Sequence, residues 1–72
     1  MVLEYNGPWH YKKLDVDMDP DSPATPYPNS KSKIETYNFD ILKLNLIFDR
    51  CSDVRIFWEK DKKLEIYNGT GL

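Results

Sequence analysis

Four aspartates occupy every second position over a short stretch of the sequence. They are Asp15, Asp17, Asp19 and Asp21, and no Lys or Arg lies anywhere in residues 14–30. On an extended strand alternate side chains project to the same side, so this spacing predicts an acidic row along one face of a strand. Such a row fits a basic surface, for example the Lys/Arg groove of a protein that handles DNA or RNA. The alternative is a solvated face whose charge protects a sheet edge from aggregation.

The same aspartates also match the first ligands of a calcium-binding loop. In an EF-hand loop that starts at Asp15, however, the glycine required at the sixth position is Pro20. The bidentate glutamate required at the twelfth position is Pro26. The sequence therefore predicts no metal site.

Three aromatic residues flank the aspartates. Trp9 and Tyr11 share the strand parity of the acidic row, opposite to Leu14 and Val16, and Tyr27 follows it. If Leu14 and Val16 face a core, Trp9 and Tyr11 point outward, and exposed aromatic residues beside charge are typical of interface anchors. The alternative is that a twisted barrel or the proline-rich segment covers them. The predicted partner-binding residues are therefore Asp15, Asp17, Asp19, Asp21, Trp9, Tyr11 and Tyr27.

The sequence offers few groups for catalysis. His10 is the only histidine and Cys51 the only cysteine, and nucleophilic catalysis needs such a pair in one pocket with a third, orienting group. The three glycines are isolated from one another, so no phosphate-binding loop is present. We predict no enzyme, no catalytic residue and no cofactor. A single cysteine also excludes an internal disulfide and a four-cysteine zinc site, which favours the cytoplasm as the compartment.

Length and composition set the scale of the molecule. The chain has 72 residues, which predicts one small domain over residues 1–72. Its net charge is −2 and its pI about 5.2, which disfavours direct binding to a phosphate backbone. Aromatic residues make up 14%, a share that argues against disorder. The longest apolar runs are three residues, too short to span a membrane.

The alternation of apolar and polar residues predicts a mainly β fold. We expect an antiparallel sheet, meander or barrel of four to five strands with a long Pro-rich loop over residues 19–33. The predicted strands are 9–18, 34–39, 42–48, 54–58 and 64–66, with turns at 49–53, 60–63 and 68–71. The predicted core contains Leu42, Leu44, Leu46, Val54, Ile56, Leu64 and Ile66. A helix over 39–50 is the competing interpretation, but no cap residues bracket that stretch.

Together these features predict a small, acidic, non-enzymatic binding protein. We expect an inhibitor encoded by a phage or mobile element, acting in the host cytoplasm. It would dock through the acidic, aromatic-flanked strand onto a basic surface of a host protein or of a defence complex that handles nucleic acid. The alternatives are a structural component of a virion or assembly and a nucleic-acid-binding β-barrel. A homodimer is left open, and no membrane partner is expected.

Overall fold

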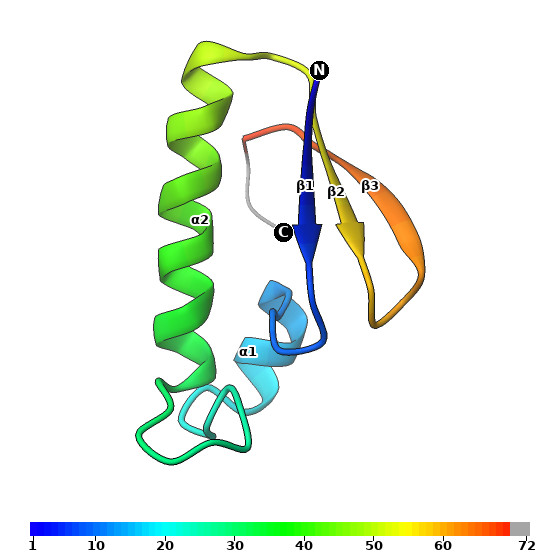
Figure 1. Ribbon diagram of the computed structural model, residues 1–72. Helices are drawn as coiled ribbons and strands as arrows, with labels where there is room; N and C mark the ends of the chain where they lie inside the picture. The colour runs from blue at the N-terminus through cyan, green and yellow to red at the C-terminus, as the bar shows by residue number, and fades with distance from the viewer. Residues whose placement is uncertain (70–72) are drawn as a thin grey trace.

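The computed structural model describes residues 1–69 and consists of three strands and two helices (Figure 1). In chain order these are β1 (Val2–Asn6), α1 (Lys13–Met18), α2 (Lys33–Arg50), β2 (Val54–Trp58) and β3 (Lys63–Tyr67). The predicted turn at 68–71 lies partly outside the described residues. In the part of the chain that is described, no helix is long and apolar enough to cross a membrane.

The three strands form one mixed sheet in the order β1-β2-β3. β1 runs parallel to β2, and β2 runs antiparallel to β3. Both helices belong to the crossover that joins the parallel strands, and Figure 1 shows α2 lying along one face of the sheet, with α1 near its lower end. The prediction of a mainly β fold with four to five strands is therefore wrong. The fold has two layers, a sheet and a long helix.

The helix α2 begins where a local signal places it. The Ser32 hydroxyl accepts a hydrogen bond from the Glu35 amide at 3.3 Å, the first half of a capping box. The predicted strands at 34–39 and 42–48 are therefore wrong. The competing interpretation, a helix over 39–50, gives the correct secondary structure and the correct end, but the helix begins six residues earlier, after a cap at the end of the predicted Pro-rich loop. Leucines at every second position fit a strand, yet they also occur on helices that are apolar on two sides.

The predicted strand over residues 9–18 is also wrong. Residues 9–12 are irregular, and α1 follows them. The Lys12 amide donates to the Asp15 carboxylate at 3.4 Å, so one of the four aspartates helps to start this helix. Only Val16 of α1 is buried.

The core lies between α2 and the inner face of the sheet. It consists of Leu44, Val54, Ile56, Trp58 and Tyr67, with Val2, Ile47 and Phe48 packed against it. The predicted burial of Leu44, Val54 and Ile56 is confirmed, as is the antiparallel pairing of the last two strands. The predicted burial of Leu42, Leu46, Leu64 and Ile66 is wrong, since all four are exposed.

The Pro-rich segment is a loop as predicted, but it is tied down. Ala24 is 2% exposed, and its amide donates to the Lys31 carbonyl at 2.8 Å. The Lys33 amide donates to the Ser22 carbonyl at 2.9 Å, and Pro23 and Ser32 form an isolated β-bridge. These contacts close the loop against the start of α2.

Candidate binding surfaces

The four aspartates do not form one row. Asp15 and Asp17 lie on α1, Asp19 is the C-cap of that helix, and Asp21 lies in the loop. A helix turns successive residues through about 100°, so the strand parity that placed them on one face does not apply. The acidic row is therefore corrected, although contact of these residues with a partner stays a prediction.

Two of the aspartates are paired with lysines from distant parts of the chain. Asp15 lies 3.2 Å from the Lys60 ammonium, and Asp19 lies 4.0 Å from the Lys33 ammonium. Burial raises the pKa of Asp15, but Lys60 and the Lys12 amide outweigh burial and leave that pKa below its usual value. Although no Lys or Arg lies near these aspartates in the sequence, the fold brings Lys33 and Lys60 close to them.

Lys12 is the centre of a second group of charges beside α1. Its ammonium lies 2.7 Å from Glu65 and 3.0 Å from Asp61, and 5.0 Å from the centre of the Trp58 ring. Burial lowers the pKa of Lys12, but the two carboxylates outweigh burial and raise it. These pairs join the start of α1 to the β2–β3 hairpin, which is a structural role.

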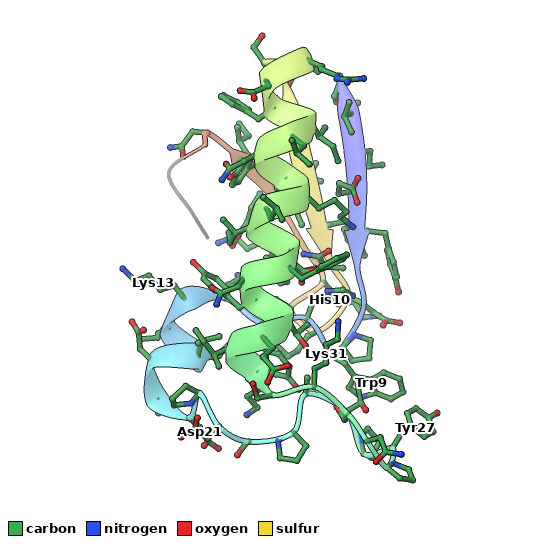
Figure 2. The ribbon with its side chains drawn as sticks, turned by 90° about the vertical axis from the view of Figure 1, so that its left-hand side faces the viewer. Trp9, His10, Lys13, Asp21, Tyr27 and Lys31 are labelled. Atoms are coloured by element: carbon green, nitrogen blue, oxygen red, sulfur yellow. The ribbon has the colours of Figure 1, made fainter. Side chains whose placement is uncertain are left out.

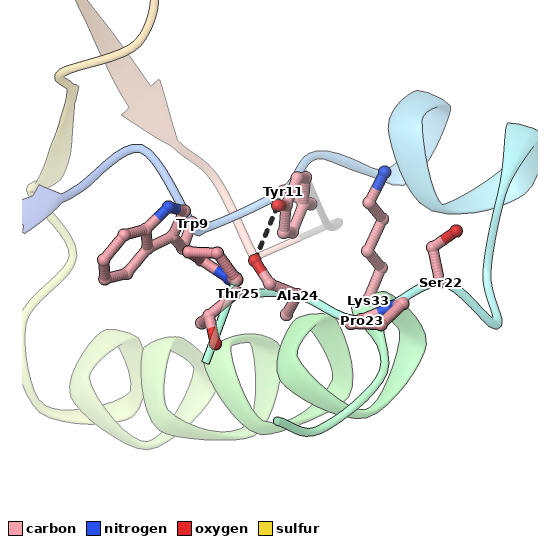
Figure 3. A pocket seen from close by; sticks show the side chains of 8 residues that line it. Trp9, Tyr11, Ser22, Pro23, Ala24, Thr25 and Lys33 are labelled. Atoms are coloured by element: carbon pink, nitrogen blue, oxygen red, sulfur yellow. Dashed lines mark hydrogen bonds between the residues drawn. The ribbon is translucent and has the colours of Figure 1, made fainter. Parts of the chain in front are cut away.

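The three predicted aromatic residues do gather around the loop. Trp9 and Tyr27 meet edge to face at 5.2 Å at the tip of the molecule, whereas Asp21 lies on the opposite side of α2 (Figure 2). The Tyr11 hydroxyl donates to the Ala24 carbonyl at 2.7 Å (Figure 3). The loop thus folds back onto Tyr11, whereas Trp9 and Tyr27 stay exposed at the surface, at 40% and 62%. These aromatic residues contact the loop and do not extend the aspartates into one surface.

An open groove of about 540 Å³ runs between these aromatic residues and the loop (Figure 3). Its lining residues are Trp9, Tyr11, Ser22, Pro23, Ala24, Thr25, Pro26 and Lys33. The lining includes no carboxylate, imidazole or thiol. Its polar side chains already have partners within the chain: Ser22 donates to Asp19, Tyr11 donates to the Ala24 carbonyl, and Lys33 lies near Asp19. The Thr25 hydroxyl accepts from the Tyr27 amide.

His10 and Cys51 are held apart. The His10 Nδ1 lies 2.6 Å from the carboxylate of Asp40, which is 4% exposed, so this pair anchors the segment after β1 to α2. Cys51 caps the far end of the same helix, about 16 Å further along its axis at 1.5 Å per residue. No group of three His, Cys, Asp or Glu side chains within residues 1–69 is placed to hold a metal ion.

A surface that the sequence did not predict lies on the sheet, on the side away from α2. We call it the open face and define it by two rows of three side chains, one from each strand. The first row is Leu3, Arg55 and Ile66, and the second is Tyr5, Phe57 and Leu64. The large side chains from the two edge strands, β1 and β3, are 49–72% exposed.

The open face is apolar with one cation at its centre. Tyr5 and Phe57 stack across the strands with their ring centres 6.0 Å apart. The Arg55 Nε lies 3.2 Å from the Asp53 carboxylate at one end of β2. Glu59 follows the other end of β2. Desolvation raises the pKa of the Tyr5 hydroxyl, and the nearby Glu59 carboxylate raises it further. One positive charge thus lies between two negative ones.

The edge strands turn their apolar side chains outward. On the side that faces α2, β1 and β3 carry Glu4, Asn6, Lys63 and Glu65 beside Val2 and Tyr67. On the other side both strands carry only apolar or aromatic residues within the open face. Alternation along each strand predicted which residues share a face. It did not predict that the apolar sides of β2 and β3 point in opposite directions.

A second exposed apolar group lies on α2. Phe39, Leu42 and Leu46 are 60–61% exposed and lie one helical turn apart along the side away from the core. Lys43, Leu46, Ile47 and Arg50 line a shallow hollow of about 280 Å³ there. This stripe is narrower than the open face and is flanked by charge.

Comparison of the chain with family models, with curated proteins and with solved structures finds no match.

Proposed function

We propose that this is a non-enzymatic binding protein and that it binds another protein through the open face. The observation that carries the proposal is the polarity of the edge strands, which present polar residues to their own core and apolar residues to the outside. A sheet face that is left to solvent normally carries polar residues, with the apolar residues on the covered face. Here α2 covers only one face.

The chemistry of the open face supports a protein partner. Leu3, Tyr5 and Ile66 are each more than half exposed. Leu3 and Tyr5 follow each other along β1, and Ile66 lies across Arg55 from Leu3. A continuous apolar patch of a few hundred Å² on a small protein is typical of an interaction site. Aromatic residues and arginine are also enriched at such sites, and Tyr5, Phe57 and Arg55 supply both.

The roles expected from the sequence belong to this class. An inhibitor that docks onto a larger host protein would need one such face, and so would a component of an assembly. In this proposal the contact is made by the sheet, while Asp15 and Asp19 mainly hold α1 and the loop in place through lysines.

A second candidate is binding of single-stranded nucleic acid. The side-by-side rings of Tyr5 and Phe57 next to Arg55 favour it, because bases stack on exposed aromatic residues of sheets. The charges oppose it, since Asp53 already pairs with Arg55 and the chain carries a net charge of −2. A protein partner is the better fit.

Site-specific photocrosslinking tests the proposal. A benzophenone side chain placed at Leu3, on the open face, should capture protein in cells that express the chain. The control is the same group at Leu14 on α1, which is also well exposed but lies outside the open face. Equal capture at both positions, or capture of nucleic acid alone, would contradict the proposal.

A further inference from the structure

We infer that the occupant of the open face is a second copy of this chain, related to the first by a twofold axis. This inference rests on the proposal that the open face binds protein. In the arrangement we propose, the two sheets stack face to face and the two α2 helices lie on the outside. The assembly then has four layers, helix, sheet, sheet and helix.

The two rows of the open face complement each other. An axis that lies between the sheets, across the strands and midway between the rows, places each row over the other row of the second copy. Given the register of the strands, Leu3 then lies over Tyr5 of the second copy and Ile66 over Leu64. A twofold interface requires this kind of self-complementary patch.

Arg55 selects this axis over the other possible one. An axis along the strands would place the two Arg55 side chains over each other, burying like charges. The axis across the strands places Arg55 over the Phe57 ring of the second copy, where a cation is attracted by the ring face. Arg55 keeps Asp53 as its partner in its own chain, so the buried centre of the interface stays neutral.

The interface that a stable dimer needs is a modest part of this surface. A stable interface buries about 800 Å² on each partner, about one-sixth of the 4967 Å² that this chain exposes, so the open face and its rim must both take part. Packed sheets lie about 10 Å apart with their strands aligned to within about 30°, which lets all six side chains of the open face interdigitate. A 72-residue chain has a small core, so this extra burial also stabilises the fold.

The ends of the interface make a distinctive prediction about salt. In the proposed arrangement Asp53 lies opposite Glu59 of the second copy at both ends, so negative charges face each other at the rim. Added salt screens that repulsion, and dimerisation should therefore hold or strengthen as salt rises. Binding of nucleic acid would weaken steeply instead.

Analytical ultracentrifugation of the purified chain, over a concentration series at low and high salt, tests the inference. We expect a dimer whose dissociation constant rises by about thirtyfold or more in Leu3→Lys, because an exposed apolar contact is replaced by a charge that the interface would bury. Leu42→Lys is the matched control, because both leucines are 61% exposed but Leu42 lies on the outer side of α2. Circular dichroism confirms that both variants fold.

A charge-swap pair tests the geometry. The Ile66→Glu chain and the Leu64→Lys chain should each be monomeric alone, whereas their mixture should form a heterodimer because the two positions lie opposite each other. A mixture that stays monomeric would overturn the proposed axis. Loss of the assembly in Leu42→Lys would instead show that the α2 stripe makes the contact.

The outcomes separate this inference from the proposed function. A wild-type chain that stays monomeric while Leu3 crosslinks to a different protein would overturn the second copy as occupant and leave the proposed function standing. A monomer with no protein captured at Leu3 would overturn both.

Discussion

The two faces of the sheet carry similar apolar side chains, but those on one face are buried and those on the other are exposed. On the inner face Val54, Ile56 and Trp58 are fully buried under α2. On the outer face Leu3 and Ile66 are 61% and 72% exposed. The difference lies in what covers each face and not in the hydrophobicity of the residues, so hydrophobicity alone does not identify the core of a thin sheet.

The two faces of the sheet also differ in where their charged residues lie. Glu4 and Glu65 both point to the inner side, where Lys43 reaches one at 3.4 Å and Lys12 reaches the other at 2.7 Å. The core is therefore centred on β2, and ion pairs lie on the inner side of both edge strands beside Val2 and Tyr67. The open face has the reverse distribution, with its one charge in the middle.

The largest effect should come from truncation on the covered side of the helix. Leu44→Ala removes a side chain that is 2% exposed and should lower the free energy of unfolding by about 2–4 kcal/mol. Leu42→Ala, on the opposite side of α2, should change it by no more than about 0.5 kcal/mol. Urea titrations followed by circular dichroism measure both. Similar losses would mean that both sides of α2 are packed.

A buried and an exposed isoleucine of the sheet should also differ in how much they contribute to stability. Ile56→Thr places a hydroxyl in a fully buried site and should cost about 2–3 kcal/mol. Ile66→Thr keeps the branched shape on the exposed side and should cost about 0.5 kcal/mol or less. The measurement is thermal or urea unfolding at low protein concentration. A large loss for Ile66→Thr in a confirmed monomer would show that the open face is covered by its own chain.

A smaller effect is expected where a polar pair ties the segment after β1 to α2. His10→Ala leaves the Asp40 carboxylate, 4% exposed, without its contact at 2.6 Å. The loss should be about 1–2 kcal/mol, and the double variant with Asp40→Leu should recover part of it. A single variant as stable as the wild type would show that the pair contributes nothing.

The smallest effect concerns the ion pairs beside α1. The pKa of Asp15 is lower in the folded chain than its usual value of 3.8, so its carboxylate stabilises the fold above that value. This contribution is lost as the pH falls through the lowered pKa. Unfolding at neutral and acid pH should show a small acid-induced loss that is reduced in Asp15→Asn. An identical acid-induced loss in the variant would assign it to other carboxylates.

Local features of the fold were predictable from the sequence. The β2–β3 hairpin follows from alternation around a short polar turn, and its pairing is confirmed. Ser32 and Glu35 form a capping signal that is visible in the sequence. The four prolines before Ser32 favoured a loop, and the predicted loop was therefore extended to residue 33, past the true start of α2. The apolar residues of 42–48 fit both the two-residue period of a strand and the 3.6-residue period of a helix, because α2 carries apolar residues on its buried and its exposed sides.

The open face could not be predicted, because it depends on pairing between distant segments. Leu64 and Ile66 alternate as regularly as Val54 and Ile56, and only the register of the hairpin shows that the two pairs point to opposite sides. The predicted acidic row on a strand was wrong for a related reason. Asp15 meets Lys60 through the fold, and no local rule pairs residues so far apart.

The parallel pairing of β1 has a consequence for the order of folding. α2, β2 and β3 follow one another along the chain and can assemble from local contacts, whereas Val2 must find Val54 across both helices and the loop. Contacts that close so long a segment form slowly. In the interval one edge of β2 lacks its neighbour and can pair with any extended segment, including β1 of another chain. We therefore expect the N-terminal strand to dock last, and to be the strand that exchanges most readily between molecules that are still folding.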